Sequence, residues 1–129
     1  MTTPEVLVVD DDADIREVIG LLLEAYGYRA RVASDGYQAL EQLRVRRDVA
    51  LILLDLMMPG LDGIEMMKAL KADTRLAQIP VVVMSGDTAA SETTVSIGAN
   101  GCLAKPVDLD GLLSTVRQYV RDGADATAR

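Results

Sequence analysis

The sequence predicts an α/β fold: a doubly wound, five-stranded parallel sheet in the order 2-1-3-4-5, with helices on both faces. Continuous apolar runs at residues 6–9, 49–54 and 81–84 are typical of strands that are buried on both faces of a parallel sheet. Segments with the apolar spacing of helices alternate with the strands from end to end, which gives five strands and five helices. If the three apolar runs are central and residues 28–33 and 102–104 are edges, right-handed crossovers favour this strand order.

The first strand is expected at residues 6–9 and is followed by an amphipathic helix. Asp12 and Asp14 are interpreted as acids that cap the amino end of this helix. Gly27 is placed to end it. The residues with the i, i+3, i+4, i+7 spacing of one helix face are Ile15, Val18, Ile19, Leu22, Leu23 and Tyr26.

Residues 28–33 are expected to form an edge strand, because charged and apolar side chains alternate there and one face would be wet. The alternating residues are Arg29, Ala30, Arg31 and Val32. The basic cluster of Arg44, Arg46 and Arg47 is interpreted as the solvated end of the next helix. The apolar run at 49–54 then supplies the central strand.

Asp62 and Glu65 form a capping-box pattern that opens a third helix with Ile64, Met67 and Leu70 on its inner face. A fourth helix between Ser85 and Lys105 is expected to be short or loosely held. Its residues Thr93, Thr94, Val95 and Ile97 are poor helix formers.

The last strand is expected at residues 102–104, and Cys102 is interpreted as a small core residue and not as a redox sensor. One domain is expected over residues 4–122. Residues 123–129 are expected to form a disordered tail, because little in them can pack.

The composition argues against several classes of function. A net charge of -7 is unfavourable for a nucleic-acid surface, and four Tyr without Phe or Trp supply little for base stacking. One cysteine excludes an intramolecular disulfide framework and suits a reducing compartment. We find no export signal and no apolar run of membrane-spanning length, so we expect a cytoplasmic protein that binds neither nucleic acid nor membrane.

Polar residues stand at the carboxyl ends of four predicted strands, which meet at one edge of a parallel sheet. They are Asp10 and Asp11 after the first strand, Asp55 after the third, Ser85 after the fourth and Lys105 after the fifth. The winding of the sheet reverses between strands 1 and 3, and ligands of open α/β sheets bind at such a reversal. Three carboxylates beside one lysine leave excess negative charge, and Mg²⁺, which prefers oxygen ligands, would offset it.

A carboxylate beside such a metal can act as a nucleophile and form an aspartyl phosphate. Asp55 is the best candidate, because it sits alone at the tip of the central strand, and Asp10 and Asp11 would then hold the metal. Lys105 and the Ser85 hydroxyl would contact phosphoryl oxygens.

Four segments of the chain resemble the signature segments of response-regulator receiver domains of two-component signalling. They are VLVVDDD at 6–12, LILLDLMMPGLDGIE at 51–65, VVVMSG at 81–86 and GANGCLAKP at 98–106. The resemblance covers about residues 5–121 and implies a flavodoxin-like fold. It also implies that Asp55 accepts a phosphoryl group from a histidine kinase or phosphotransfer protein.

The resemblance implies further roles for individual residues. Mg²⁺ would be bound by Asp11, Asp55 and the main-chain carbonyl of Met57, while Asp10 acts mainly through water. Lys105-Pro106 is similar to a bond that is cis in the family. Cys102 departs from the family, because it stands where receivers usually have a Tyr or Phe ring that turns inward with the serine or threonine at position 85.

The expected function is therefore a signalling switch, not an enzyme acting on other substrates, that works without an output domain and binds an unidentified downstream protein when phosphorylated. Two alternatives remain. One is an aspartate-nucleophile phosphatase of the haloacid-dehalogenase kind, because Asp10 and Asp12 copy its DxD pattern, although Ala13 replaces the usual Gly. The other is a receiver fold kept only as a docking surface.

Overall fold

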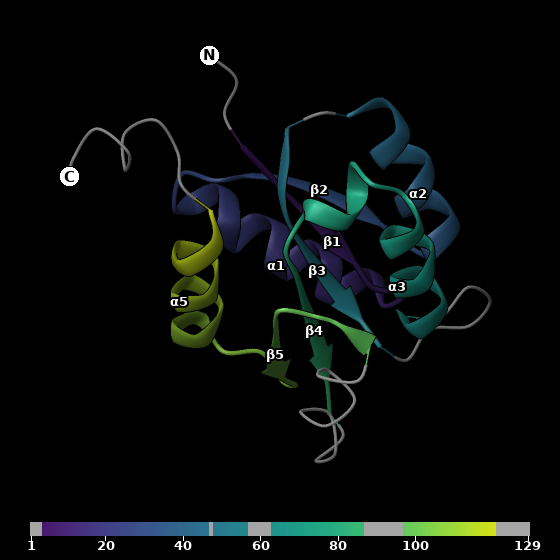
Figure 1. Ribbon diagram of the computed structural model, residues 1–129. Helices are drawn as coiled ribbons and strands as arrows, with labels where there is room; N and C mark the ends of the chain where they lie inside the picture. The colour runs from purple at the N-terminus through teal and green to yellow at the C-terminus, as the bar shows by residue number, and fades with distance from the viewer. Residues whose placement is uncertain (1–3, 47, 57–62, 87–96, 121–129) are drawn as a thin grey trace.

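The structure, a computed structural model, describes residues 4–46, 48–56, 63–86 and 97–120. All five predicted strands are present and every neighbouring pair is parallel, in the predicted order β2-β1-β3-β4-β5 (Figure 1). The strands are β1 (Glu5–Val9), β2 (Arg29–Ala33), β3 (Val49–Asp55), β4 (Val81–Ser85) and β5 (Gly101–Ala104).

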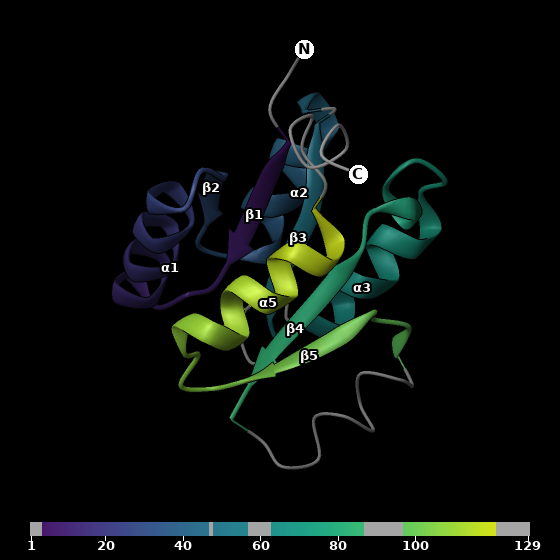
Figure 2. The ribbon, with the colours of Figure 1, turned by 90° about the vertical axis from the view of Figure 1, so that its left-hand side faces the viewer.

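Helices cover both faces of the sheet, as predicted. They are α1 (Ala13–Ala25), α2 (Gly36–Val45), α3 (Gly63–Ala72) and α5 (Leu109–Tyr119), with a 3₁₀ turn η1 (Leu76–Gln78) before β4. Figure 2 shows α1 and α5 on the near face and α2 and α3 on the far one. Of the predicted fourth helix between Ser85 and Lys105, residues 87–96 lie outside the described part of the chain. Met57, Asp62 and the tail at 123–129 also lie outside it.

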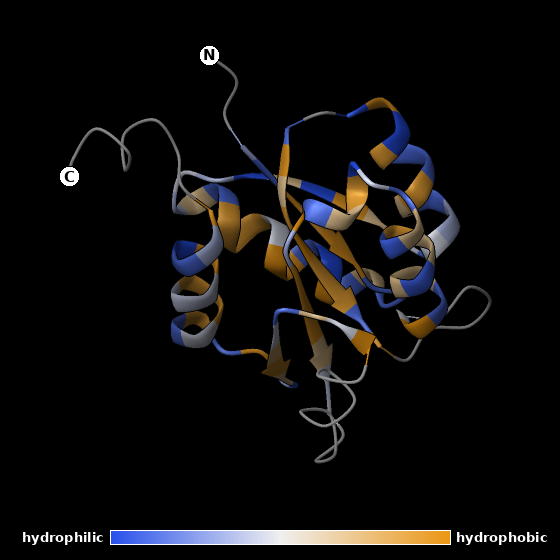
Figure 3. Cartoon of the chain, in the orientation of Figure 1, coloured by the Kyte–Doolittle hydropathy of each residue, from blue (hydrophilic) through white to orange (hydrophobic). Residues whose placement is uncertain are grey.

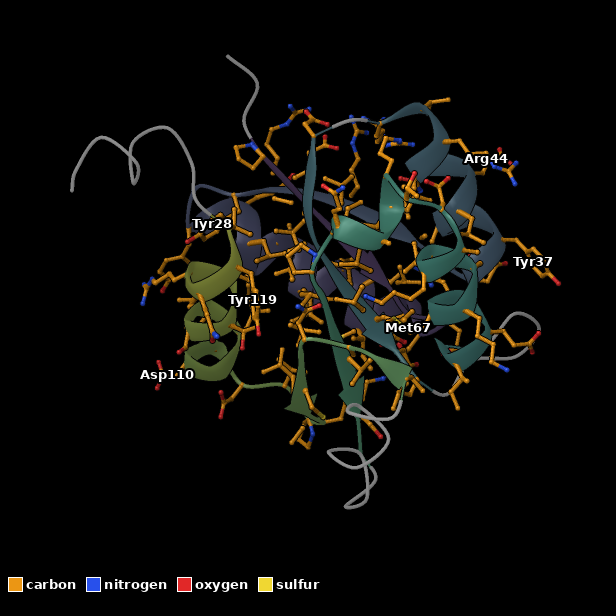
Figure 4. All side chains as sticks on the ribbon, viewed as in Figure 1. Tyr28, Tyr37, Arg44, Met67, Asp110 and Tyr119 are labelled. Atoms are coloured by element: carbon orange, nitrogen blue, oxygen red, sulfur yellow. The ribbon has the colours of Figure 1, made fainter. Side chains whose placement is uncertain are left out.

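The central strands explain the continuous apolar runs. Val6 and Val8 of β1 face the core under α1 and α5, whereas Leu7 and Val9 face the core under α2 and α3. Both faces of the strand are therefore buried, and Figure 3 shows the central strands as the most hydrophobic part of the chain. Methionine contributes to the aliphatic core: Met67, labelled in Figure 4, lies between α3 and the sheet and is 1% exposed.

Helix α1 begins and ends where the sequence predicts. The Asp12 carboxylate accepts hydrogen bonds from the backbone N–H groups of Asp14 and Ile15, and Gly27 after the helix has a φ of 91°. The predicted inner face is too wide, however, because Val18 is 55% and Tyr26 is 50% exposed. Since α1 packs mainly over the edge strand β2 and its neighbour β1, only a narrow stripe of the helix is covered.

The edge strands differ from their predictions at two positions. Val32 is 44% exposed on β2, which is an edge strand without a neighbouring strand on its outer side. Cys102 on β5 is exposed, so its interpretation as a core residue was wrong. In this edge strand Leu103 points into the core under α5, and the alternation of side chains places Cys102 on the opposite face.

The basic cluster after α2 is solvated only in part. Arg44 is exposed, as expected. Arg46 instead turns inward, and its Nη1 lies 3.6 Å from Oε2 of the buried Glu5. No pattern in the sequence indicates this ion pair, because Glu5 and Arg46 are distant in the chain. Arg47 lies outside the described residues.

Candidate functional site

The predicted acids converge at the carboxyl edge of the sheet. Asp10 and Asp11 follow β1 and Asp55 ends β3, and each offers a carboxylate oxygen within 4.8 Å of the oxygens of the other two. Asp10 and Asp55 are buried, whereas Asp11 is exposed. Because β1 and β3 are neighbours in the sheet, the crossover at the switch point brings these distant residues together.

Hydrogen bonds between strands hold this edge together beyond the strand ends. The Asp10 N–H donates to the carbonyl of Ala33 at 3.1 Å, and the Lys105 N–H donates to the carbonyl of Ser85 at 3.0 Å. The last rungs of the sheet therefore fix the backbone positions of the candidate site residues relative to one another.

Asp10 is fully engaged by its surroundings. One carboxylate oxygen, Oδ1, accepts a hydrogen bond from the Asp12 N–H at 2.9 Å, and Oδ2 accepts one from Lys105 Nζ at 2.9 Å. The Arg16 guanidinium donates to the Asp10 main-chain carbonyl at 2.7 Å. Asp10 is thus a fixed, buried anchor for Lys105, and Asp11 is the acid that faces solvent.

Lys105 bridges the two buried acids. Its Nζ lies 2.9 Å from Asp10 Oδ2 and 3.3 Å from Asp55 Oδ2. Partial burial alone lowers the pKa of Lys105, but the hydrogen bond from Lys105 to Asp10 and the charges of Asp55 and Asp10 outweigh burial, so the pKa lies above its usual 10.5. The ammonium stays charged, and three carboxylates beside one ammonium still leave an excess of negative charge.

Ser85 is also brought to this edge. It is buried at the end of β4 and pairs in register with Ala104, the residue before Lys105. The Lys105-Pro106 peptide bond is cis, as the family resemblance implied. Met57, the remaining predicted metal ligand, lies outside the described residues.

Gly63 packs against the backbone at the end of β3, beside Asp55, and the sequence did not indicate this role. As the first residue of α3, its N–H donates to the carbonyl of Leu56 at 3.3 Å. A Cβ at this position would lie 2.7 Å from Leu56 Cα and 2.8 Å from the carbonyl oxygen of Asp55. Only glycine lets α3 approach the end of β3 this closely.

In the described part of the chain, none of the helices has the length and hydropathy needed to span a lipid bilayer.

Comparisons with known proteins agree with this geometry. The sequence profile of the family described as "Response regulator receiver domain" matches residues 6–117. The DNA-binding response regulator MtrA of Mycolicibacterium paratuberculosis is 35% identical over 125 residues, which cover 95% of this chain and 54% of that protein. The DNA-binding dual master transcriptional regulator RpaA of Synechocystis is 35% identical over 120 residues, covering 92% of this chain and 49% of that protein.

Solved structures agree as well. The structure of the chemotaxis protein CheY4 of Vibrio cholerae superposes with a TM-score of 0.85 at 29% sequence identity. The match covers 92% of this chain and 100% of the CheY4 chain. A response regulator receiver protein from Pseudomonas putida has a TM-score of 0.84 at 34% identity, covering 92% of this chain and 98% of that one. The chain spans about half the length of the curated relatives it matches.

Proposed function

Because the chain belongs to the family of response regulator receiver domains, we propose that it is a phosphorylation-dependent switch of two-component signalling in which Asp55 accepts the phosphoryl group. One observation carries the assignment to these residues. Asp10, Asp11 and Asp55 present oxygens within 4.8 Å of one another, and Lys105 lies between the two buried acids.

The chemistry of the donor set fits Mg²⁺. Asp11 and Asp55 would hold the ion with the main-chain carbonyl of Met57, and these hard oxygen donors suit its preference for oxygen. Both oxygens of Asp10 already accept hydrogen bonds, which favours a role for Asp10 through water. When bound, Mg²⁺ supplies positive charge against the oxygens of the incoming phosphoryl group.

In the proposed transfer, a carboxylate oxygen of Asp55 attacks the phosphorus of a phosphohistidine on the donor protein. The new P–O bond forms as the P–N bond breaks, and the imidazole of the donor leaves. Lys105 stays anchored to Asp10 and pairs with a phosphoryl oxygen a short distance from its present contact with Asp55 Oδ2. The Ser85 hydroxyl donates to another oxygen.

Phosphorylation in this proposal biases an existing equilibrium between two conformations. The phosphodonor is a histidine kinase or a phosphotransfer protein, and a downstream protein recognises the phosphorylated form. The curated relatives are named as DNA-binding regulators and are about twice as long as this chain. Our expectations that the chain lacks an output domain and does not bind nucleic acid therefore stay predictions.

The test is intact-mass measurement after incubation with a small phosphodonor and Mg²⁺. Wild type should gain the mass of one phosphoryl group, and Asp55→Asn should gain none. Asp14→Asn is the matched control, because Asp14 is an exposed acid of the first turn of α1, and it should be phosphorylated like wild type. No gain on wild type, or an equal gain on Asp55→Asn, would refute the assignment.

The phosphatase alternative finds no support in the comparisons, and the same variants test it. That alternative makes Asp10 the nucleophile and predicts steady turnover of a generic phosphate ester. The turnover would be abolished by Asp10→Asn and kept by Asp55→Asn. If the chain is the proposed switch, wild type, Asp10→Asn and Asp55→Asn should all show no such turnover.

A further inference from the structure

Arginines gather at the amino ends of the strands, at the pole of the sheet opposite to Asp55. Glu5, the first residue of β1, has a side chain that is only 1% exposed. Its Oε2 lies 3.1 Å from Arg29, 3.0 Å from Arg31 and 3.6 Å from Arg46. One buried carboxylate therefore faces three guanidinium groups.

Arg75 adds a fourth guanidinium without adding a counter-charge. Its Nη2 donates to the carbonyl of Leu43 at 2.6 Å, and its Nη1 donates to the carbonyl of Arg46 at 3.2 Å. These neutral acceptors belong to the carboxyl end of α2, and none of the ion pairs in the described part of the chain includes Arg75. They orient the guanidinium without forming an ion pair. The Asp73 carboxylate lies close by, because its Oδ1 accepts a hydrogen bond from the Arg75 backbone N–H at 2.9 Å.

The charge balance at this pole is positive in a chain whose net charge is -7. The only other carboxylate in the described ion pairs of this cluster is Asp48, which lies 3.9 Å from Arg29. With Asp73 beside Arg75, the four guanidinium groups of Arg29, Arg31, Arg46 and Arg75 are accompanied by three carboxylates among the described residues.

A cavity of about 240 Å³ opens between Arg46 and Arg75. Gln78 adds a neutral polar group to its lining, Ile79 and Pro80 add apolar surface, and none of the described residues that line it is acidic. Two buried atoms of this cluster have no hydrogen-bond partner among the described residues, the donor Nε of Arg46 and the acceptor Oε1 of Glu5. Leaving a buried donor unpaired costs roughly 1–3 kcal/mol, so this guanidinium is not saturated by the protein.

We propose that this cavity binds a small oxyanion of the phosphate class. Guanidinium groups bind tetrahedral and carboxylate oxyanions through paired N–H donors, and they do so best where they are already oriented. Arg75 is oriented by two carbonyls, and Arg46 carries an unused donor. The site lies at the opposite end of the strands from Asp55 and does not depend on the phosphorylation proposed there.

Nuclear magnetic resonance of the arginine Nε–Hε groups tests this site in the full chain. Inorganic phosphate is titrated without Mg²⁺ at constant ionic strength set with chloride, into wild type and into Asp55→Asn. The Arg46 and Arg75 signals should shift and saturate equally in both proteins. Arg44, which projects outward from α2 in Figure 4, should not shift and serves as the internal control.

A second arm repeats the titration with adenosine monophosphate. Saturation in either arm supports an oxyanion site. Saturation at a lower concentration of inorganic phosphate indicates a site for free phosphate. Saturation at a lower concentration of adenosine monophosphate indicates a site for the phosphate group of a larger ligand.

Substitution of Gln78 changes the charge of the lining without touching either arginine. Gln78 is exposed, so Gln78→Glu and Gln78→Lys should both fold. The added carboxylate should weaken phosphate binding by about tenfold, and the added ammonium should strengthen it by a similar factor. Arg44→Gln changes the net charge by the same amount as Gln78→Glu and should bind like wild type.

Three results would overturn the proposal. They are shifts that grow linearly without saturation, shifts that chloride alone reproduces, and equal affinities for Gln78→Glu and Gln78→Lys.

Discussion

The effect of Gly63→Ala follows directly from the close packing of α3 against the end of β3. The added Cβ would lie 2.7 Å from Leu56 Cα and 2.8 Å from the carbonyl oxygen of Asp55, whereas ordinary van der Waals contact begins at 3.4 Å. The atoms that it meets are backbone atoms of the strand end that carries Asp55. They cannot rotate away as a flexible side chain would, so either α3 or this strand end must shift by about 0.6–0.7 Å.

The energetic cost can be set against the gain in helix propensity. Overpacking of this kind costs about 1–3 kcal/mol. Alanine is better than glycine in a helix by roughly 0.5–1 kcal/mol, and this gain offsets part of the cost. We therefore expect Gly63→Ala to lower the free energy of unfolding by about 1–2 kcal/mol. A displaced Asp55 should also slow phosphorylation by about tenfold, because nucleophiles act only in a narrow range of positions.

Gly20→Ala is the matched control, since Gly20 lies inside α1 and an added Cβ would lie 4.0 Å from Val32 Cγ1. That substitution should raise the free energy of unfolding by about 0.5–1 kcal/mol and leave phosphorylation unchanged. Urea denaturation and the rate of mass gain from a small phosphodonor measure the two effects. A Gly63→Ala protein as stable and as rapidly phosphorylated as Gly20→Ala would refute the reasoning.

Three further predictions concern charged groups. Because the folded pKa of Lys105 is raised, its pairing stabilises the fold fully below the unfolded value of 10.5 and is lost as the pH rises through the higher folded value. The difference in urea midpoint between wild type and Lys105→Met should therefore stay constant from about pH 7 to about pH 10 and shrink above it; a decline that begins near neutrality would contradict the assignment. Glu5→Gln should destabilise the fold by about 1–3 kcal/mol in urea titrations, because three guanidinium groups lose their buried counter-charge, whereas Gln at the exposed Glu17 should change little. Mg²⁺ should raise the melting temperature of wild type, and Asp11→Asn should need at least about tenfold more Mg²⁺ for the same rise, unless Asp11 is no ligand.

The strand order could be predicted because strands buried on both faces have continuous apolar sequences. β1, β3 and β4 are covered on both faces, and their runs contain apolar residues without alternation. Once these strands were central, the acids after β1 and β3 had to meet, and they do. The candidate site was thus predictable from topology and from the position of each residue at a strand end.

Contacts between distant residues could not be predicted in this way. Cys102 looked like a core residue by composition, but its exposure depends on which face of the edge strand it occupies. Arg46 was predicted to be solvated, because its partner Glu5 is about forty residues away in the sequence. The role of Gly63 could not be predicted, since its close approach to Asp55 is a property of the packed backbone.

The contacts around Asp10 have a consequence for protein engineering. The Asp12 N–H holds the Asp10 carboxylate, the Asp12 carboxylate caps α1, and Arg16 in α1 reaches back to the Asp10 carbonyl. These hydrogen bonds join the acidic loop to the first turn of α1 as one rigid unit. A tag, linker or new chain terminus inserted between positions 10 and 16 would break these hydrogen bonds and weaken the contact between Asp10 and Lys105. The turn at Gly27 is a better insertion site, because it is remote from them.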